Sequence, residues 1–383
     1  MSEEAPRSGA PQRVLSIDAL RGFDMALLMG GAAALIGVSR ALGLDSIAEV
    51  LAEQTEHPEW NGFTAWDLVF PLFLFLAGAS MPFSFAKRRA SGETRGALVR
   101  HAVMRGAALV ALGVVYNGFF GSHLFAEDGR ELRYASVLGR IGLAWMLAAF
   151  AVIALPRTKA LVGVLVGCLA LHSALLLGVP APGLDGVSLA PGETFPDWID
   201  SRIVPGRLHR TVRDPEGLVG VIPAVGTALL GVLAGRWIQS GRGESRPRGV
   251  GATSGPLALA GAALLAVSYG ADAAGLPINK NLWTASFVAH AGGWSLLLLA
   301  LFHLAFDGLR LERLGAFFQV LGANSILVYL VSAFVSWSGL AEVVFALALR
   351  NGRLAQDFVP LAGFLLQWLV FYGLWRRRIF LRV

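Results

Sequence analysis

The sequence is poor in charged residues. Asp, Glu, Lys and Arg make up 15% of its 383 residues, against about 25% in a typical soluble chain. Hydrophobic residues account for 55%, and the mean hydropathy is +0.61. Although the length alone would allow two or three soluble domains, this composition excludes both a soluble enzyme and a disordered chain. We predict an all-α polytopic membrane protein.

Several chemical signatures are also missing. The one cysteine, Cys168, lies in an apolar run, so neither an internal disulfide nor a cysteine-based metal cluster can form. The histidines show no metal-ligand spacing, and neither a P-loop nor a GxSxG elbow occurs. The first apolar run carries Asp18, Arg21 and Asp24, which argues against a cleavable signal peptide. We expect no metal and no nucleic-acid partner.

Long apolar stretches are abundant instead. Ten of them approach the roughly 20 residues that cross a bilayer, and they lack the alternation of a β-barrel. We therefore predict ten helices in one transmembrane domain, 13–383, after a disordered cytoplasmic tail, 1–12. A shorter apolar stretch, 340–349, is predicted to be interfacial or re-entrant. The ten spans are 19–41, 64–86, 98–119, 136–155, 159–179, 217–239, 253–272, 283–306, 315–336 and 357–376.

Lysine and arginine concentrate in alternate loops. With the N-terminus inside, nineteen of them lie in inside segments and nine in outside loops. This bias and the even number of spans predict that both termini are cytoplasmic. The basic residues at the inner rim either set this topology alone or also bind an anionic ligand. They include Lys87, Arg88, Arg89, Arg310 and Arg313.

Polar residues within spans are costly, so they mark candidate sites. Asp18 and Arg21 are three residues apart and can pair on one helix face, while Asp24 lies deeper in the first span. The other candidates are Arg140, Asp214, Glu216, Asn279, Lys280, Trp283 and Asn324. Two of them have simpler explanations, since Trp283 suits an aromatic belt and Asn324 suits a contact between helices.

The segment HPEWNGFTAWDLVFP, 57–71, lies where the first outer loop meets the second span. Histidine accepts and returns protons near neutral pH, so His57 is a candidate general base if the loop folds back onto Asp67. Asp67 would then hold the imidazole in one tautomer, and Asn61 would donate to an oxyanion. An exposed loop histidine is the simpler alternative. From the residues alone, a transporter, a channel and an intramembrane transferase stay open.

Six segments, in order and over nearly the whole chain, resemble the transmembrane acyltransferases related to heparan-alpha-glucosaminide N-acetyltransferase. The segments with HxxWNGxxxxDLVFP and DPEGL are specific, whereas SxDxLRG is shared with wider acyltransferase families. His290 stands where the family has an apolar residue. The segments are RVLSIDALRGFDM (13–25), HPEWNGFTAWDLVFPLFLFLAGASM (57–81), SVLGRIGLAW (136–145), DPEGLVGVIPAVGTALLGVLAGRW (214–237), PINKNLWTASF (277–287) and GANSILVYL (322–330).

The resemblance implies transfer of an acetyl group from cytosolic acetyl-CoA to the amino group of a glucosamine-type sugar across a bacterial inner membrane. It places the catalytic histidine at His57, as base or acetyl carrier, and the outer aspartate at Asp67, with Asn61 beside them. Trp60 joins the scattered polar residues as a substrate-binding candidate, and the inner-rim cations become candidates for binding CoA. A homodimer is also implied. An amino-sugar or N-acetyl-sugar permease, and an acyltransferase acting on an envelope glycan, are the alternatives.

Overall fold

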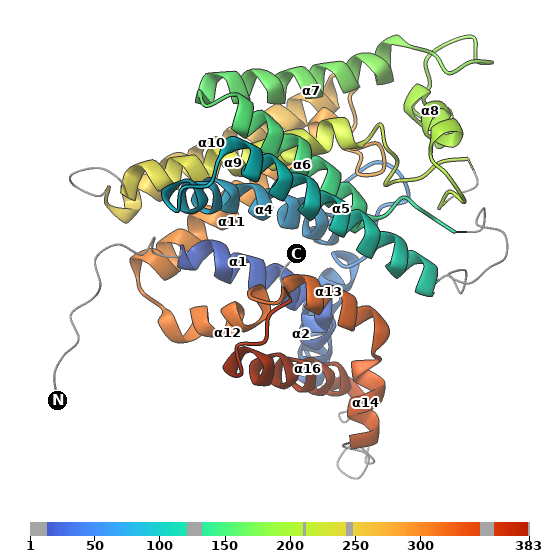
Figure 1. Cartoon of the computed structure of the whole chain (residues 1–383). Coiled ribbons are helices and arrows are strands. Elements are labelled where there is room, and N and C mark those ends of the chain that lie inside the picture. The colour runs from blue at the N-terminus through green and yellow to red at the C-terminus, as the bar shows by residue number, and fades with distance from the viewer. Residues whose placement is uncertain (1–13, 121–131, 210–211, 243–247, 345–355, 382–383) are drawn as a thin grey trace.

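The computed structural model describes residues 14–120, 132–209, 212–242, 248–344 and 356–381 (Figure 1). Within them, eight helices are long and apolar enough to cross a membrane, or nine if one bent pair counts as a single span. The prediction of an all-α membrane protein is confirmed for this part of the chain. The count of ten spans and the cytoplasmic position of both termini stay predictions. The predicted tail, 1–12, lies outside the described residues.

The long helices follow the predicted spans, because only a helix satisfies its own backbone hydrogen bonds in lipid. The tenth predicted span corresponds to α16, which is 18 residues long but is not among the eight. The described helices are α1 Leu15–Ala26, η1 Leu27–Gly31, α2 Ala32–Ala41, α3 Asp45–Glu53, α4 Ala65–Ala90, α5 Arg95–Phe120, α6 Val137–Ala154, α7 Thr158–Gly178, α8 Phe195–Ile203, α9 Val221–Arg242, α10 Val250–Ala273, α11 Ala285–Phe302, η3 His303–Gly308, α12 Glu312–Gly322, α13 Ser325–Phe334, α14 Trp337–Val344 and α16 Val359–Arg376.

Two predicted spans are broken. In the first, α1 continues through the π-helical turn η1 into α2, and Gly30 has a φ of 105°, in the left-handed region that favours glycine. In the ninth, α12 and α13 are bent by 64°. There the side chain of Asn324 donates to the carbonyl of Ile379 and accepts from the amide of Leu381. One continuous helix over 315–336 is therefore a wrong prediction, because the break lets Asn324 bind the last segment of the chain.

The helices form two groups, which α1 joins (Figure 1). The larger group contains the closely packed pairs α4–α9, α5–α6 and α10–α11, with α7 against α9. The smaller group contains α2, α12, α13, α14 and α16. α1 packs along α12 and also contacts α4 and α11. The boundary between the groups therefore runs between α1 and α4.

The larger group is organised around α4, which α9 holds through close backbone contacts. A Cβ atom at Gly78 would lie 2.1 Å from the carbonyl oxygen of Ala228, and one at Gly231 would lie 1.9 Å from that of Phe75. Packing of small residues drives helix association in lipid, where the hydrophobic effect gives no help. The position of α4 thus depends on these two glycines.

The outward faces of the peripheral helices are apolar. α7 and α10 expose large side chains such as Leu171, Leu259 and Val267, whereas most of the apolar stretches of α4 and α9 are buried in the bundle. Repeated exposure of large apolar side chains along a helix suits contact with lipid tails and not with water. The chain is a multi-pass membrane protein whose peripheral helices face the bilayer.

Candidate active site

The loop before α4, residues 54–64, closes on itself at the predicted outer face. Thr64 Oγ1 donates to the carbonyl of Glu56 at 2.7 Å, and the amide of Trp66 donates to the carbonyl of Gln54 at 3.0 Å. These hydrogen bonds bring His57 back over the first turn of α4. The loop thus makes the fold-back that a contact between His57 and this helix requires.

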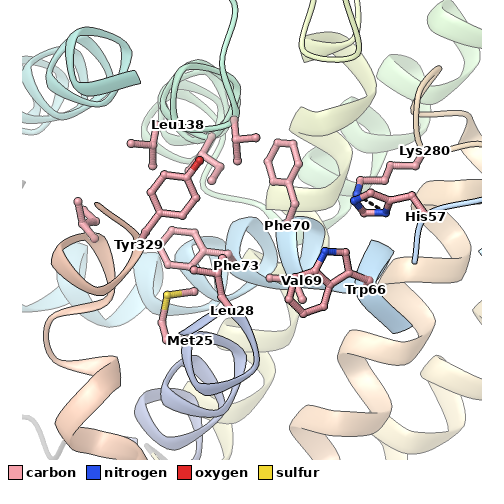
Figure 2. A pocket seen from close by; sticks show the side chains of 13 residues that line it. Met25, Leu28, His57, Trp66, Val69, Phe70, Phe73, Leu138, Lys280 and Tyr329 are labelled. Carbon is pink, nitrogen blue, oxygen red and sulfur yellow. Dashed lines mark hydrogen bonds between the residues drawn. The ribbon is translucent and has the colours of Figure 1, made fainter. Parts of the chain in front are cut away.

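His57, Asp67 and Lys280 meet at this point, and Figure 2 shows His57 beside Lys280. His57 Nδ1 lies 2.7 Å from Asp67 Oδ1, while Lys280 Nζ lies 3.1 Å from the same oxygen and 3.5 Å from His57 Nδ1. The side chain of Asp67 is 1% exposed and that of His57 is 52% exposed. When Nδ1–H donates to Asp67, Nε2 carries the lone pair and can accept a proton.

The start of α4 fixes the orientation of the Asp67 carboxylate. Asp67 is the third residue of the helix, and its Oδ2 accepts the backbone N–H of Thr64 at 3.2 Å in a capping box. The helix dipole stabilises a negative charge at this position. Because one oxygen caps the helix, the other stays directed at His57 and Lys280.

The loop 277–284 is tied to the first loop by Asn279. The buried Asn279 Nδ2 donates to the carbonyl of Trp60 and to Oδ1 of Asn61, both at 3.0 Å. This contact places the next residue, Lys280, in the site. It also engages Asn61 Oδ1, whereas donation to an oxyanion would use Asn61 Nδ2. The oxyanion role of Asn61 stays a prediction.

Two pockets meet at His57 and Lys280. An apolar pocket of about 140 Å³ lies between α1, η1, α4, α6 and α13 (Figure 2), and a polar pocket of about 290 Å³ lies on the predicted outer side. They share His57, Phe70, Val137 and Lys280. The apolar pocket is also lined by Met25, Leu28, Trp66, Val69, Phe73, Leu138, Ile141, Ile326 and Tyr329. The polar pocket is also lined by Pro58, Glu59, Trp60, Gly62, Asp67, Arg133, His209, Arg213, Pro215, Glu216, Asn281 and Trp283.

A cluster of charges borders the polar pocket. Arg133 donates to both carboxylate oxygens of Asp214, at 2.7 and 2.6 Å, and also pairs with Glu216. Burial lowers the pKa of Arg133, but the two carboxylates outweigh it and hold this pKa above its ordinary value. Burial raises the pKa of Asp214, but the hydrogen bonds and charge of Arg133 outweigh it and hold this pKa below its ordinary value. Arg133, which the sequence analysis missed, thus neutralises two predicted substrate-binding residues.

The long loop 180–216, on the predicted outer side, contacts the site through Trp60. Trp60 Nε1 donates to the carbonyl of Leu189 at 2.9 Å, and the guanidinium carbon of Arg213 lies 4.4 Å from the centre of its ring. Both Trp60 and Arg213 line the polar pocket. This loop therefore forms part of the pocket wall.

Trp283 lines the polar pocket, and Arg140 packs against its ring. Trp283 is 1% exposed and its Nε1 donates to Thr227 Oγ1 at 3.2 Å, so Trp283 is not in a lipid-facing aromatic belt. Its φ of 53° places a bulky residue in the left-handed region, a type of strain that clusters at functional sites. Arg140 lies 5.1 Å from the Trp283 ring centre and donates to the carbonyl of Gly217 at 3.1 Å.

The candidates on α1, Asp18, Arg21 and Asp24, line neither of these two pockets. Arg21 Nη1 lies 3.4 Å from Asp18 Oδ1, as their spacing predicts, and Arg21 Nη2 donates to Ser80 on α4. Asp24 is fully buried, and its carboxylate oxygens make no hydrogen bond among the described residues. Asn324 binds the last segment of the chain and lines neither pocket within the described residues.

The predicted inner cations differ in their surroundings. Arg88 is half-buried and its Nη1 pairs with Glu93 at 3.0 Å. The other four are exposed, namely Lys87, Arg89, Arg310 and Arg313. Over the described ranges, no group of three His, Cys, Asp or Glu side chains is arranged to hold a metal ion.

His290 belongs to a hydrogen-bond network inside α10 and α11. Its Nδ1 lies 2.9 Å from Ser268 Oγ, and its Nε2 accepts from Trp294 Nε1 at 3.2 Å. Its ring centre lies 4.5 Å from that of Phe63, which belongs to the loop 54–64. Because both ring nitrogens are engaged, we interpret His290 as a support for that loop.

Comparison with known proteins agrees with the motifs. Residues 13–179 match the family model described as "Domain of unknown function (DUF5009)". The chain is similar to heparan-alpha-glucosaminide N-acetyltransferase. The mouse protein is 26% identical over 323 residues, which cover 72% of the chain and 48% of the relative. The human protein is 26% identical over 372 residues, which cover 84% and 53%. The chain thus spans about half the length of these relatives, and the resemblance inferred from its motifs is confirmed.

Proposed function

We propose that the chain is a membrane acetyltransferase. It moves an acetyl group from cytoplasmic acetyl-CoA to the amino group of a glucosamine-type sugar outside a bacterial inner membrane. The observation that supports this most is the group His57, Asp67 and Lys280 at the junction of an apolar and a polar pocket. The apolar pocket suits a pantetheine arm with its acetyl thioester, and the polar pocket suits a hydroxyl-rich sugar. The printed names of the relatives support this reaction class.

In the direct route, His57 acts as a general base. The acceptor ammonium loses one proton to solvent after it enters the polar pocket, and the resulting amine attacks the thioester carbonyl while His57 Nε2 takes a second proton. Asp67 stabilises the resulting imidazolium through Nδ1–H. The C–S bond then breaks, and the CoA thiolate receives the proton from His57. Lys280 supplies positive charge close to the developing oxyanion.

In the relay route, His57 carries the acetyl group. Nε2 attacks the thioester carbon, the C–S bond breaks, and CoA leaves as the thiolate. The sugar amine then attacks the acetyl carbon, the bond between Nε2 and this carbon breaks to restore the free histidine, and the proton lost by the amine passes to the CoA thiolate. An acetyl group trapped on the wild-type chain and absent from His57→Ala supports this route, whereas its absence from both chains during turnover supports the direct one.

The polar pocket offers groups that recognise an amino sugar. Trp60 and Trp283 contribute aromatic surface, and Glu59 contributes negative charge that attracts an ammonium group. Glu59 makes no ion pair among the described residues, so we assign it the first contact with the acceptor.

Reconstituted vesicles test the proposal. With acetyl-CoA on the predicted cytoplasmic side and glucosamine on the other, we expect acetylated sugar and free CoA, and His57→Ala should lower the rate about 10²–10⁴-fold. Glu53→Ala, on the exposed end of α3, is the matched control and should keep wild-type activity. Sugar that accumulates without acetyl-CoA would establish a permease instead. Product found only on an envelope glycan would change the acceptor.

The quaternary structure is a separate question. The homodimer that the resemblance implies stays a prediction. Light scattering of the purified protein measures the mass of the protein component and distinguishes a monomer from a dimer.

A further inference from the structure

Basic side chains gather around Trp145 in the predicted cytoplasmic half of the bundle. The guanidinium carbon of Arg105, on α5, lies 4.4 Å from the centre of the Trp145 ring. The charges of Arg21, on α1, and Arg88, on α4, act on the Arg105 guanidinium. Arg88 Nη2 also lies 3.3 Å from His101 Nδ1. We name Arg21, Arg88, His101 and Arg105 the inner basic cluster.

One member of the inner basic cluster, Arg105, has no acidic partner among the described residues. Asp18 pairs with Arg21, and Glu93 pairs with Arg88. Arg105 makes no ion pair among the described residues, and its buried Nε makes no hydrogen bond there. A buried charge in a membrane protein is normally paired. An anion from outside the chain would complete this cluster.

The cluster lies on the inner side of the apolar pocket. Arg21 reaches Ser80 on α4, and one helical turn further along α1, Met25 lines the apolar pocket. On α4 the pocket is lined as far as Phe73, two turns before Ser80. Thirteen residues of α4 separate Asp67 from Ser80, which is about 20 Å along a helix. A ligand that reaches both places has an anionic head and a long, narrow arm.

We propose that Arg105 and Arg21 bind the phosphate groups of the donor, with Arg88 at the edge of this site. This inference rests on the proposed acetyltransferase function. It names particular arginines as ligands of the phosphates, which a count of basic residues in the loops cannot do. Guanidinium groups match phosphate oxygens with paired hydrogen bonds, and the Trp145 ring holds Arg105 in place. The exposed cations at the rim, Lys87 and Arg89 among them, then serve topology alone.

A comparison of two acetyl donors distinguishes binding of the phosphates from binding of the thioester and its arm. S-acetylpantetheine carries the same thioester and arm as acetyl-CoA but no nucleotide. In Arg105→Ala we expect the affinity for acetyl-CoA to fall about 10–100-fold, as for a lost charged hydrogen bond, while acetyl transfer from S-acetylpantetheine stays within twofold of wild type. Arg105→Lys keeps the charge and should retain part of the affinity. Arg100→Ala, an exposed arginine on the same helix, is the matched control and should change neither donor.

The outcomes distinguish this inference from the proposed function. Unchanged acetyl-CoA affinity in Arg105→Ala, or equal loss with both donors, would overturn the assignment of Arg105. If the wild-type protein binds acetyl-CoA and Arg105→Ala gives either of these results, the proposed function still stands. A wild-type protein that binds no acetyl-CoA contradicts the proposed function itself.

Discussion

We call His57, Asp67 and Lys280 the outer site, after their predicted side of the membrane. The outer site and the inner basic cluster differ in whether their charges are paired. At the outer site, the buried Asp67 carboxylate is shared between His57 and Lys280, so opposite charges lie within hydrogen-bonding distance of one another. In the inner basic cluster, three arginines lie near one another and Arg105 has no acidic partner among the described residues. Both regions border the boundary between the two helix groups.

This difference indicates different tasks. A site with internally paired charges is preorganised, and it can move a proton without waiting for a ligand. Like charges held together by the fold repel one another, and a bound anion relieves that repulsion. The outer site therefore suits chemistry and the inner basic cluster suits binding. Variants that affect only one region test this division.

The largest effect is expected for Asp67→Asn. Asparagine can still cap α4 through its side-chain oxygen, but it no longer stabilises a charged imidazole, so acetyl transfer should fall about 10²–10⁴-fold. Affinity for acetyl-CoA, measured by equilibrium binding, should stay within twofold, because the inner basic cluster is untouched. Asp45→Asn, on the outer helix α3, is the control. Equal loss of donor affinity and rate would remove the distinction between the two regions.

A large loss of stability is expected for Arg133→Met. Removing one partner of a buried ion pair costs about 3–5 kcal/mol, here because Asp214 loses its countercharge. Thermal unfolding followed by tryptophan fluorescence measures this, and the exposed Arg202→Met is the control. Donor affinity of the surviving folded protein should not change.

Arg133→Met should also reverse the pH dependence of the stability. In the wild type the pKa of Asp214 is lowered, so its contribution is complete above its ordinary pKa of about 4. That contribution is lost as the pH falls through the lowered value. Without Arg133, burial raises the pKa of Asp214, so the variant should gain stability as the medium becomes acidic. An identical pH profile in both chains would contradict this.

A smaller effect, about tenfold in rate, is expected for Lys280→Met, the size of one charged hydrogen bond. Lys280 Nζ lies 3.1 Å from Asp67 Oδ1 and 3.5 Å from His57 Nδ1, so this substitution removes a hydrogen bond to the carboxylate and a positive charge beside the reacting groups. The steady-state rate of acetyl transfer at a fixed pH measures the loss. Lys159→Met, on the opposite predicted face, is the control. An unchanged rate in Lys280→Met would show that Lys280 takes no part in the reaction.

Much of the candidate site could be predicted from residues that are close together in the sequence. His57 and Asp67 share one segment, and their roles follow from residue type and from the motif that surrounds them. Arg105 was also within reach of the sequence, because a charge inside the third predicted span obeys the same rule that drew attention to Asp24. Arg133 was not, since an arginine in a polar outer loop gives no signal until Asp214 and Glu216 are folded against it.

The amino-acid sequence by itself determined the membrane class, most helix bounds and the motifs around His57. These depend on apolar length and on residues close together in the chain. Only the tertiary structure decided that Lys280 joins His57 and Asp67, that Asn324 binds Ile379 and Leu381, and that the charge of Arg21 acts on Arg105. Each of these contacts joins segments tens to hundreds of residues apart, and their meeting depends on helix packing, which hydropathy does not encode.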